Sequence, residues 1–465
     1  CAAQTCRRGR WTRMPAPGTA GRCTTRAPAS SDREPSEGRL LVLRAVVDAA
    51  DAQGGGALDP VAAVAALSDD AEICGCNGVC KGAITGAITA QGLTTLDDVR
   101  AVTKASASCG SCTPLVEQVI RLTLSDGFKA QAGPKPMCKC THHPHGDVRK
   151  AIVEFELKSM PAVFQAMEWT TPDGCASCRP ALNYYLLCAW PSAYRDDKQS
   201  RYINERVHAN IQKDGTYSVV PRMWGGMTSP AELRAIADVA DKYAIPAVKV
   251  TGGQRIDLLG VKKEDLPAMW ADFARAGLVS GHAYGKSLRT VKTCVGSEHC
   301  RFGTQRSMEL GVKLEKMLFG MWSPHKFKLA VSGCPRNCAE SGIKDIGVIG
   351  VDSGYELYVG GNGGIKTEVA QFFCKVADDD EVLEYGGAFI QLYREEGFYL
   401  ERTCHYLERV GLEHVKKAVL DNADQRQALY ERLLFALQNY KDPWAEIVED
   451  QAGGVHKRQF EIIKV

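Results

Sequence analysis

Hydrophobic and polar positions in the middle of the chain change their periodicity in a regular order. Residues 217–224 and 247–251 have the short apolar pattern of strands, and residues 229–232 (Ser-Pro-Ala-Glu) combine a capping box with proline at the first helical position. Helical spacing returns over residues 263–276, and Gly277 is placed to end that helix. The pattern predicts a β-α-β unit followed by a second helix.

The two ends of the chain have other patterns. From about residue 367 to residue 447 the spacing is largely helical, with breaks expected at Gly386-Gly387, Gly397 and Gly411. The first 36 residues contain no Val, Ile, Leu or Phe and cannot bury a core. We interpret them as a disordered or artefactual tail, with a nucleic-acid-binding arm as the minor alternative. Because position 1 is not Met, the chain is interpreted as a fragment or a processed chain.

Composition excludes several classes of protein. Among 465 residues, 57 basic and 55 acidic side chains give a net charge of +2, so general nucleic-acid binding is not expected. No apolar run approaches the roughly 20 residues of a membrane span, so no membrane association is expected. The 19 cysteines are too sparse for a small disulfide scaffold. Without a signal peptide, a cytoplasmic, reducing location is predicted, in which paired cysteines bind metals.

Eight of the cysteines form an internal repeat. The first copy has Cys74-Gly-Cys76 and, 32 residues later, Cys109-Gly-Ser-Cys112; the second has Cys138-Lys-Cys140 and, 34 residues later, Cys175-Ala-Ser-Cys178. A proline follows the last cysteine of each copy by two positions, which places that thiolate at the start of a helix, where free N–H groups favour negative charge. Four such thiolates suit either a [2Fe–2S] cluster or zinc, and the residues leave that choice open.

Four more cysteines form a third group. Five residues separate Cys294 from Cys300, and three separate Cys334 from Cys338. On a helix the second pair would share one face, and a loop would fold the first pair back toward it. Thiolates that converge from two such pairs suit a [4Fe–4S] cluster.

A strand is predicted just before the third group. Apolar residues alternate at Phe327, Leu329 and Val331, and the same period places Lys326 and Lys328 together on the opposite face. A single lysine is usually a solvated surface charge. Further on, residues 360–364 (Gly-Gly-Asn-Gly-Gly) indicate either a hairpin turn or backbone N–H groups that approach an anionic ligand.

These motifs resemble two families of redox proteins. The C-x-C motif followed about 32 residues later by C-x-x-C is similar to bacterioferritin-associated ferredoxin domains, and two in tandem resemble the middle of the large subunit of assimilatory NAD(P)H nitrite reductases. The third group resembles the sirohaem/[4Fe–4S] signature of nitrite and sulfite reductases. The resemblance implies a [2Fe–2S] cluster on each copy of the repeat and a [4Fe–4S] cluster on the third group, with Cys338 bridging the cube to sirohaem.

The resemblance also implies the residues of a substrate site. Sirohaem carries carboxylates and its substrate is a small anion, and both require clustered cations. Lys326 and Lys328 are implied as substrate cations and proton donors, and Arg289 as an arginine ahead of the first cysteine pair. Where the family has a further arginine this chain has glycine, so Arg255, two positions later, is a candidate. Candidates for contacts with the macrocycle are Arg222, Asn362 and Gly363.

Two features of the family are missing from the chain. Large subunits of this kind begin with a lobe for FAD and a pyridine nucleotide, but the chain has no G-x-G-x-x-G motif, so FAD and NAD(P)H are expected on a separate reductase module. Many relatives carry the ferredoxin-like and sirohaem halves twice, whereas this chain has each once, so a homodimer is expected. A small Rieske-like subunit is a further expected partner.

The whole pattern predicts an α+β multidomain chain that reduces nitrite to ammonium. Small helical [2Fe–2S] domains precede a ferredoxin-like α/β half-domain, a sirohaem/[4Fe–4S] α+β domain and a helical C-terminus. The alternatives are an assimilatory sulfite reductase, a non-catalytic iron–sulfur carrier, or a zinc-stabilised interaction protein. The predicted boundaries are 1–38 (tail), 39–126 (helical leader and first [2Fe–2S] domain), 134–192 (second [2Fe–2S] domain), 193–210 (linker), 211–281 (half-domain), 282–366 (sirohaem/[4Fe–4S] domain) and 367–465 (helical region).

Overall fold

The computed structural model describes residues 64–74, 77–106, 112–124, 135–364, 367–438 and 440–450 of the chain. These residues form two compact units, one that ends at Lys129 and one that begins at Ala130. The predicted tail (1–38), most of the predicted leader, and the cysteines Cys76 and Cys109 lie outside the described residues. None of the described helices has the length and apolar character needed to cross a bilayer.

The first unit is a small helical domain with a short hairpin. Its elements are β1 (Glu72–Cys74), β2 (Val79–Cys80), α3 (Lys81–Gln91), α4 (Leu96–Thr103) and α5 (Thr113–Leu124). Thr95 caps α4, because its hydroxyl accepts the backbone N–H of Asp98 at 3.2 Å. Cys112 directly precedes α5, so its thiol lies at a helix N-terminus, as predicted. The core of the unit includes Ile84, Ile88, Val99, Val116, Val119 and Ile120.

The second unit begins with another helical domain. It consists of α6 (His145–Glu154), α7 (Met160–Ala166) and α8 (Cys178–Ala189), followed by the short helices η2 (Lys198–Ser200) and α9 (Ile203–Val207) of the predicted linker. Its core continues into later parts of the chain, since Trp322 and Tyr399 belong to the same buried cluster. The Tyr184 hydroxyl donates to the backbone carbonyl of Arg394 at 2.9 Å. The domain is therefore fixed to the rest of the unit by buried contacts.

A four-stranded antiparallel sheet follows, in the order β3-β4-β6-β5. Its elements are β3 (Asn210–Ile211), β4 (Tyr217–Val219), η3 (Trp224–Gly226), α10 (Pro230–Lys242), β5 (Ala247–Val250), β6 (Ile256–Val261), η4 (Lys263–Asp265) and α11 (Leu266–Arg275). The helix starting at Pro230 has the predicted capping box with Ser229. The predicted strand over 217–224 is shorter than expected: β4 ends at Val219, and Trp224 belongs to a 3-10 turn in which Gly225 and Gly226 take positive φ. The pattern did not indicate β6, which lies between the two predicted strands.

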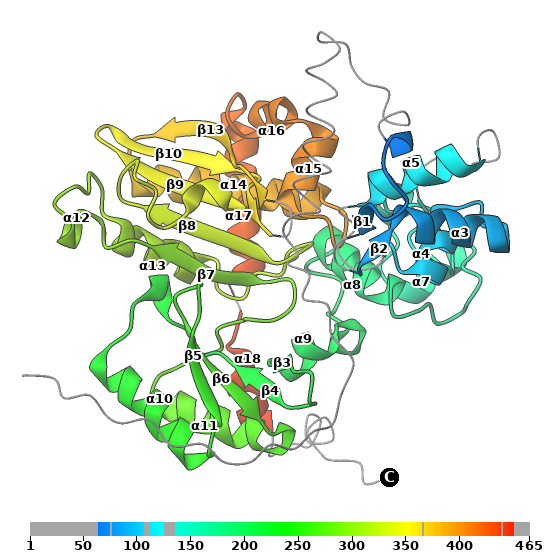
Figure 1. Ribbon diagram of the computed structural model, residues 1–465. Helices are drawn as coiled ribbons and strands as arrows, with labels where there is room; N and C mark the ends of the chain where they lie inside the picture. Colours follow the sequence, from blue (N-terminus) through cyan, green and yellow to red (C-terminus); the bar gives the residue numbers. More distant parts are fainter. Residues whose placement is uncertain are drawn as a thin grey trace, which may run out of the picture. The chain divides into compact units, whose positions relative to one another are not determined.

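The largest sheet has five strands in the order β13-β10-β9-β8-β7. These are β7 (Leu288–Thr293), β8 (Phe327–Ser332), β9 (Ile346–Val351), β10 (Gly354–Val359) and β13 (Gln371–Val376), with α12 (Gly296–His299), α13 (Ser307–Met317) and η5 (Ser341–Ile343) between them. The three strands β7, β8 and β9 are parallel, and β10 and β13 are antiparallel to their neighbours. Figure 1 shows α13 and α14 beside this sheet.

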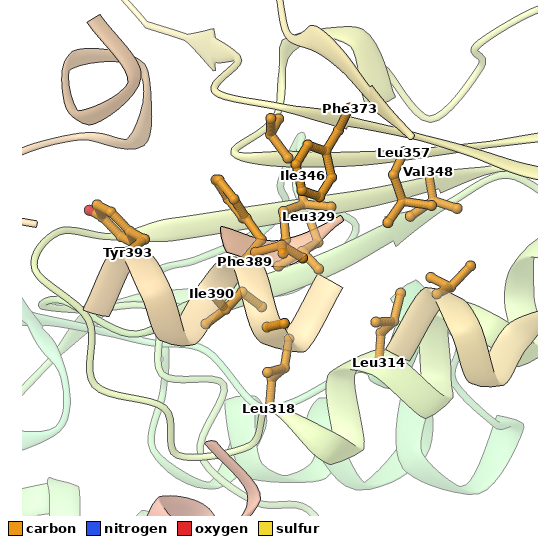
Figure 2. Packing of buried hydrophobic residues seen from close by; sticks show 14 of the residues in the cluster. Leu314, Leu318, Leu329, Ile346, Val348, Leu357, Phe373, Phe389, Ile390 and Tyr393 are labelled. Carbon is orange, nitrogen blue, oxygen red and sulfur yellow. The ribbon is translucent and has the colours of Figure 1, made fainter. Parts of the chain in front are cut away.

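One face of the five-stranded sheet is apolar. Figure 2 shows Phe389, Ile390 and Tyr393 of α14 (Asp379–Glu396) beside side chains from the strands, with Leu314 and Leu318 of the α13 region completing the layer. Leu329, Ile346, Val348, Leu357 and Phe373 supply the sheet side of this core. Burial of this many large side chains is the main stabilising term of the unit.

The C-terminal part differs in two ways from the expectation of a purely helical region. Residues 367–376 contain β12 (Thr367–Glu368) and β13, and β13 completes the five-stranded sheet. The expected break at Gly386-Gly387 is wrong, because α14 runs through both glycines. A Cβ on Gly387 would stand 2.6 Å from the ring of Tyr430, so this glycine permits close packing of α14 on α17. The remaining helices are α15 (Thr403–Val410), α16 (Leu412–Val419), α17 (Ala423–Leu437) and α18 (Pro443–Asp450).

Candidate active site

The face of the five-stranded sheet opposite the apolar core carries the predicted lysines. Phe327, Leu329 and Val331 belong to the core cluster, as the alternation predicts. Lys326 and Lys328 line a cavity of about 390 Å³ on the other side of β8. The period of two therefore separates core and site along a single strand.

An irregularity in β7 places further polar groups at the same cavity. Leu288 pairs with Phe327 and Val291 pairs with Leu329, so β7 contains one residue more than β8 between these pairs. Such a bulge re-aims side chains. Arg289, Thr290 and Lys292 all line the cavity. Regular alternation would not have placed all three on one face.

Six cationic side chains surround this cavity. The expected residues Arg255, Arg289, Lys326 and Lys328 come from three elements that lie far apart in the sequence, and the structure brings them together. Gly363 also lines the cavity, as do two acidic residues, Glu340 and Asp257. The two cations that the sequence motifs did not indicate are Lys292 and Lys344.

The cations differ in how they are paired. Lys292 and Lys344 each lie 3.1 Å from a carboxylate oxygen of Glu340. Arg255 donates through Nη1 to the carbonyl of Gly281 at 3.0 Å, while its buried Nε has no hydrogen-bond partner.

Three cations remain without counter-charge. Within the described part of the chain, the charged groups of Arg289, Lys326 and Lys328 make no ion pair, so the cavity has an excess of positive charge. Such an excess favours an anion or a carboxylate-bearing ligand.

The local electrostatics lower the pKa values of these cations. Burial, together with the nearby guanidinium of Arg402, lowers the pKa of Lys326 and of Lys328 below the ordinary lysine value. Burial and neighbouring arginines lower the pKa of Arg255 to about 9, and burial lowers that of Arg289 to about 10. The two arginines stay cationic at neutral pH, and the lysines become better proton donors than free lysine.

A buried carboxylate supports the lysine strand from behind. Asp345 is fully buried and accepts the backbone N–H of Lys328 at 2.9 Å. Both of its oxygens also accept from Arg402, at 3.0 and 2.9 Å, and Thr403 donates to it as well. This fork holds the Arg402 charge near the lysines and fixes the start of β8.

The third group of cysteines lies on the loops that follow β7 and β8. Thr293 pairs with Val331, so Cys294 and the loop before Cys334 leave adjacent parallel strands at the same edge of the sheet. The backbone N–H of Gly333 donates to Sγ of Cys294 at 3.1 Å. A Cβ on Gly333 would stand 2.8 Å from Cα of Gly296, so the two loops pack with no room for a side chain.

The second half of this group is not helical. Residues 333–340 form turns, and Asn337 and Glu340 take positive φ of 56° and 61°, so a shared helix face is not the reason for the Cys334–Cys338 spacing. Cys334 is buried, whereas Cys338 is exposed two residues before Glu340 of the cavity lining. The exposed thiol therefore stands close in sequence to the cationic cavity.

The repeated cysteines can be compared only in part. In the second copy, the sulfur atoms of Cys138, Cys140, Cys175 and Cys178 all lie within 4.8 Å of one another. In the first copy Cys74 is buried and its sulfur accepts the backbone N–H of Ser106 at 3.4 Å, as a thiolate ligand would.

Comparison with known families agrees with this geometry. The family model for the nitrite and sulphite reductase 4Fe-4S domain matches residues 284–427, and that for the nitrite/sulfite reductase ferredoxin-like half domain matches residues 210–276. The BFD-like [2Fe-2S] binding domain matches twice, at residues 72–121 and 136–187. A "Sulfite reductase, assimilatory-type" from Nitratidesulfovibrio vulgaris is 36% identical over 218 residues, which are 47% of this chain and 99% of that protein. The chain belongs to the nitrite and sulfite reductase family.

Longer relatives are similar over more of the chain, including its two helical domains. "Nitrite reductase [NAD(P)H]" of Bacillus subtilis is 56% identical over 387 residues, 83% of this chain and 48% of that protein. The "Nitrite reductase [NAD(P)H] large subunit" of Klebsiella oxytoca is 38% identical over 395 residues, 83% of this chain and 40% of that subunit. The chain thus spans half or less of the length of these two relatives.

The structure does not support the expectation that Arg222 contacts the cofactor. Arg222 lies outside the cavity lining, with a side chain that is 0% exposed, and forms an ion pair with the equally buried Glu315. Its guanidinium also donates to the backbone carbonyls of Ser280 and Arg289 and lies 2.8 Å from Nδ1 of His282. Because these partners take four of its five N–H donors and its side chain is buried outside the cavity, Arg222 stabilises the contacts between the half-domain and the five-stranded sheet.

The glycine-rich motif forms the predicted hairpin. β11 (Asn362–Gly363) pairs with β12, and a Cβ on Gly361 would stand 2.5 Å from the carbonyl oxygen of Lys344. This close approach brings the hairpin to the cavity, where Gly363 is a lining residue. Sequence patterns did not predict that Lys292 and Lys344 line the cavity. The bulge in β7 breaks the alternation before Lys292, and no motif includes Lys344.

Proposed function

We propose that this chain is the sirohaem and [4Fe–4S] part of an assimilatory nitrite reductase that converts nitrite to ammonium. The observation that carries the proposal is the cavity with an excess of cations, whose lining residues Lys292, Lys328 and Glu340 lie on or next to the two strands and the loop that lead to the four cysteines. Six electrons and eight protons convert one nitrite into one ammonium and two waters. Such a reaction needs an anion site, proton donors and one-electron centres close together.

The residues present fit a carboxylate-rich macrocycle. The unpaired charges of Arg289, Lys326 and Lys328 and the unpartnered Nε of Arg255 match anionic groups, and Gly363 allows the chain to approach closely. Cys294, Cys300, Cys334 and the exposed Cys338 are the residues that would hold the cluster and sirohaem. Sirohaem with its cluster would supply the one-electron redox chemistry.

The chain's own side chains would then handle the anion and its protons. Lys326 and Lys328 bind the oxygens of nitrite and, with their lowered pKa values, donate protons to them. Arg289 and Arg255 hold negative charge without releasing protons at neutral pH. Asp345 acts as a positioning residue, because it orients the lysine strand through the backbone N–H of Lys328.

Electrons and partners follow from the relatives. The two relatives named NAD(P)H nitrite reductases are about twice as long as this chain, so we propose that NAD(P)H and FAD act on a reductase module outside it. Electrons would enter through the [2Fe–2S] domain at residues 72–121, with Cys74, Cys76, Cys109 and Cys112 as ligands. A small Rieske-like subunit is a further proposed partner. All described cysteines are free thiols, which fits a cytoplasmic location.

We also propose a homodimer. The strand β5 forms an edge of the four-stranded sheet, and all four of its residues are exposed, including Val248 at 51% and Val250 at 76%. An exposed apolar edge is a template for pairing with another strand. Analytical ultracentrifugation of Val250→Lys against the unchanged chain tests this, and an unchanged chain that is a fully active monomer would rule the dimer out.

Sulfite reduction is the second candidate, because the whole length of an assimilatory-type sulfite reductase aligns with this chain. Turnover of nitrite and of sulfite with an artificial reductant separates the two. We expect faster nitrite turnover, and faster sulfite turnover would reverse the assignment. Absorption spectra add a check, since sirohaem bands support the enzyme and a sulfur-to-iron envelope alone would support an electron carrier.

A further inference from the structure

The second copy of the cysteine repeat forms a compact socket outside the active site. Cys138 and Cys140 precede α6, Cys175 lies in the loop before α8, and Cys178 is the first residue of α8. All four sulfur atoms lie within 4.8 Å of one another, and within the described residues no other group of three or more such ligands comes this close. Cys140 and Cys178 are buried, at 6% and 0% exposed.

The distances discriminate between the two kinds of metal centre. A tetrahedral ion with metal–sulfur bonds of about 2.3 Å sets all of its sulfur–sulfur separations near 3.8 Å. Two irons side by side hold thiolates on different irons more than about 5 Å apart. The sulfurs of Cys175 and Cys178 are 3.7 Å apart, and no pair in the socket exceeds 4.8 Å. The socket fits one ion and is too small for a [2Fe–2S] cluster.

Backbone donors stabilise thiolates at this socket. The N–H of Cys140 donates to Cys138 at 3.3 Å, that of Cys175 to Cys178 at 3.1 Å, and that of Ser177 to Cys175 at 3.4 Å. Four thiolates that accept hydrogen bonds from backbone N–H groups are typical of structural zinc. Soft sulfur ligands in tetrahedral array exclude magnesium and calcium.

Residues next to the socket connect the second helical domain to other parts of the chain. Arg179, next to Cys178, reaches Asp197 at 2.9 Å and Ser200 at 3.1 Å and so holds the linker. In the middle of α8, the Tyr184 hydroxyl donates to the backbone carbonyl of Arg394 in α14. An ion at the start of α8 would hold in place a helix that contacts both the linker and α14, the helix that packs on the five-stranded sheet.

We propose that Cys138, Cys140, Cys175 and Cys178 hold one tetrahedral zinc ion and no [2Fe–2S] cluster. The zinc ion braces the second helical domain against the linker and α14. The two copies of the cysteine repeat then have different roles. The first helical domain, at residues 72–121, transfers electrons, and the second helical domain has a structural role. This inference does not depend on which oxyanion is reduced.

Metal analysis of the full chain, purified without added metal and without chelators, tests the proposal. We expect one zinc per chain, and zinc-edge X-ray absorption should show a single shell of four sulfurs near 2.3 Å with no metal neighbour. No zinc, together with a second [2Fe–2S] signal in electron paramagnetic resonance of the reduced chain, would overturn it. These measurements need no variant and so do not depend on one folding.

Variants locate the ion. Cys138→Ser should lose the zinc and keep the iron content, while Cys74→Ser in the first copy should lose iron and keep zinc. Cys404→Ser, at a cysteine outside all three groups, is the matched control and should change neither metal. A loss of two irons in Cys138→Ser would refute the proposal. If Cys138→Ser does not fold, Cys138→His should restore both fold and zinc, since histidine is an equally good zinc ligand.

Discussion

Arg222 and the lysine pair Lys326 and Lys328 are cations with different surroundings, and their neighbours give them opposite roles. Around Arg222, each of the three guanidinium nitrogens has a partner: Glu315, the backbone carbonyls of Ser280 and Arg289, and His282. Around Lys326 and Lys328, six cations converge on a cavity, and within the described chain Lys326, Lys328 and Arg289 make no ion pair. The difference teaches that burial of a cation does not by itself mark a binding site. Pairing decides whether its charge stabilises the fold or is available to a ligand.

The largest expected effect is at the unpaired group. Lys326→Met removes a cation and proton donor, and we expect nitrite turnover to fall by about 10²–10⁴-fold while sirohaem content and the melting temperature stay the same. Lys375→Met, at an exposed position of β13, is the matched control and should keep full turnover. Normal turnover in Lys326→Met would remove this lysine from the site.

At the paired group the expected loss is of stability. Arg222→Met leaves Glu315 as an unpaired buried charge, which costs about 3–5 kcal/mol. We expect the midpoint of urea unfolding, followed by the absorption of the iron centres, to fall well below that of the unchanged chain. Arg432→Met breaks an exposed ion pair with Glu395 and should cost about 1 kcal/mol or less. Equal midpoints for the two variants would contradict the structural role of Arg222.

This contrast shows how far sequence patterns reach. Alternation in β8 predicted which residues face the core and which face the site, because period two is a property of the strand itself. The spacing of Cys294, Cys300, Cys334 and Cys338 predicted two loops that come together, and these loops do leave adjacent strands at one edge of the sheet, although the second pair lies in turns and not on a helix. That the four thiolates share one cluster stays a prediction.

The remainder depends on contacts that no local pattern encodes. A bulge in β7 brings Lys292 beside Arg289, and a hairpin that packs on Lys344 brings that lysine to the cavity. Arg222 was expected to bind the cofactor because a sequence does not show that Glu315, 93 residues away, pairs with it. Gly387 was expected to break a helix. Instead, α14 continues through it, because the absence of a side chain lets α14 pack against Tyr430.

A smaller effect concerns the pH dependence at the unpaired group. The pKa of Lys328 is lowered by burial, then by Arg402 and Lys326, and also by Lys344. Activity that needs the ammonium form is lost as pH rises through this lowered value, so the basic limb of kcat/KM for nitrite should lie below pH 10.5. Lys344→Met removes one repelling cation and should move the limb to higher pH by less than about one unit. Lys316→Met, exposed on α13, should leave the limb in place, and a shift to lower pH in Lys344→Met would contradict this electrostatic account.

The smallest effect sharpens the comparison at the paired group. His282 is fully buried between Arg222, at 2.8 Å from Nδ1, and Tyr440, at 2.7 Å from Nε2, and burial with the neighbouring Arg222 charge holds its pKa well below the ordinary 6.5. In the unfolded chain it binds a proton near pH 6.5, so its contribution to stability is present above that pH and is lost as pH falls below it. The slope from this one group is at most about 1.4 kcal/mol per pH unit. Melting temperatures between pH 7 and pH 5 should therefore fall less steeply in His282→Gln than in the unchanged chain, while His405→Gln, at an exposed position on α15, should keep the original slope. Parallel slopes for His282→Gln and the unchanged chain would mean that this histidine is already charged in the folded state, and the paired group would then hold two adjacent cations against one carboxylate.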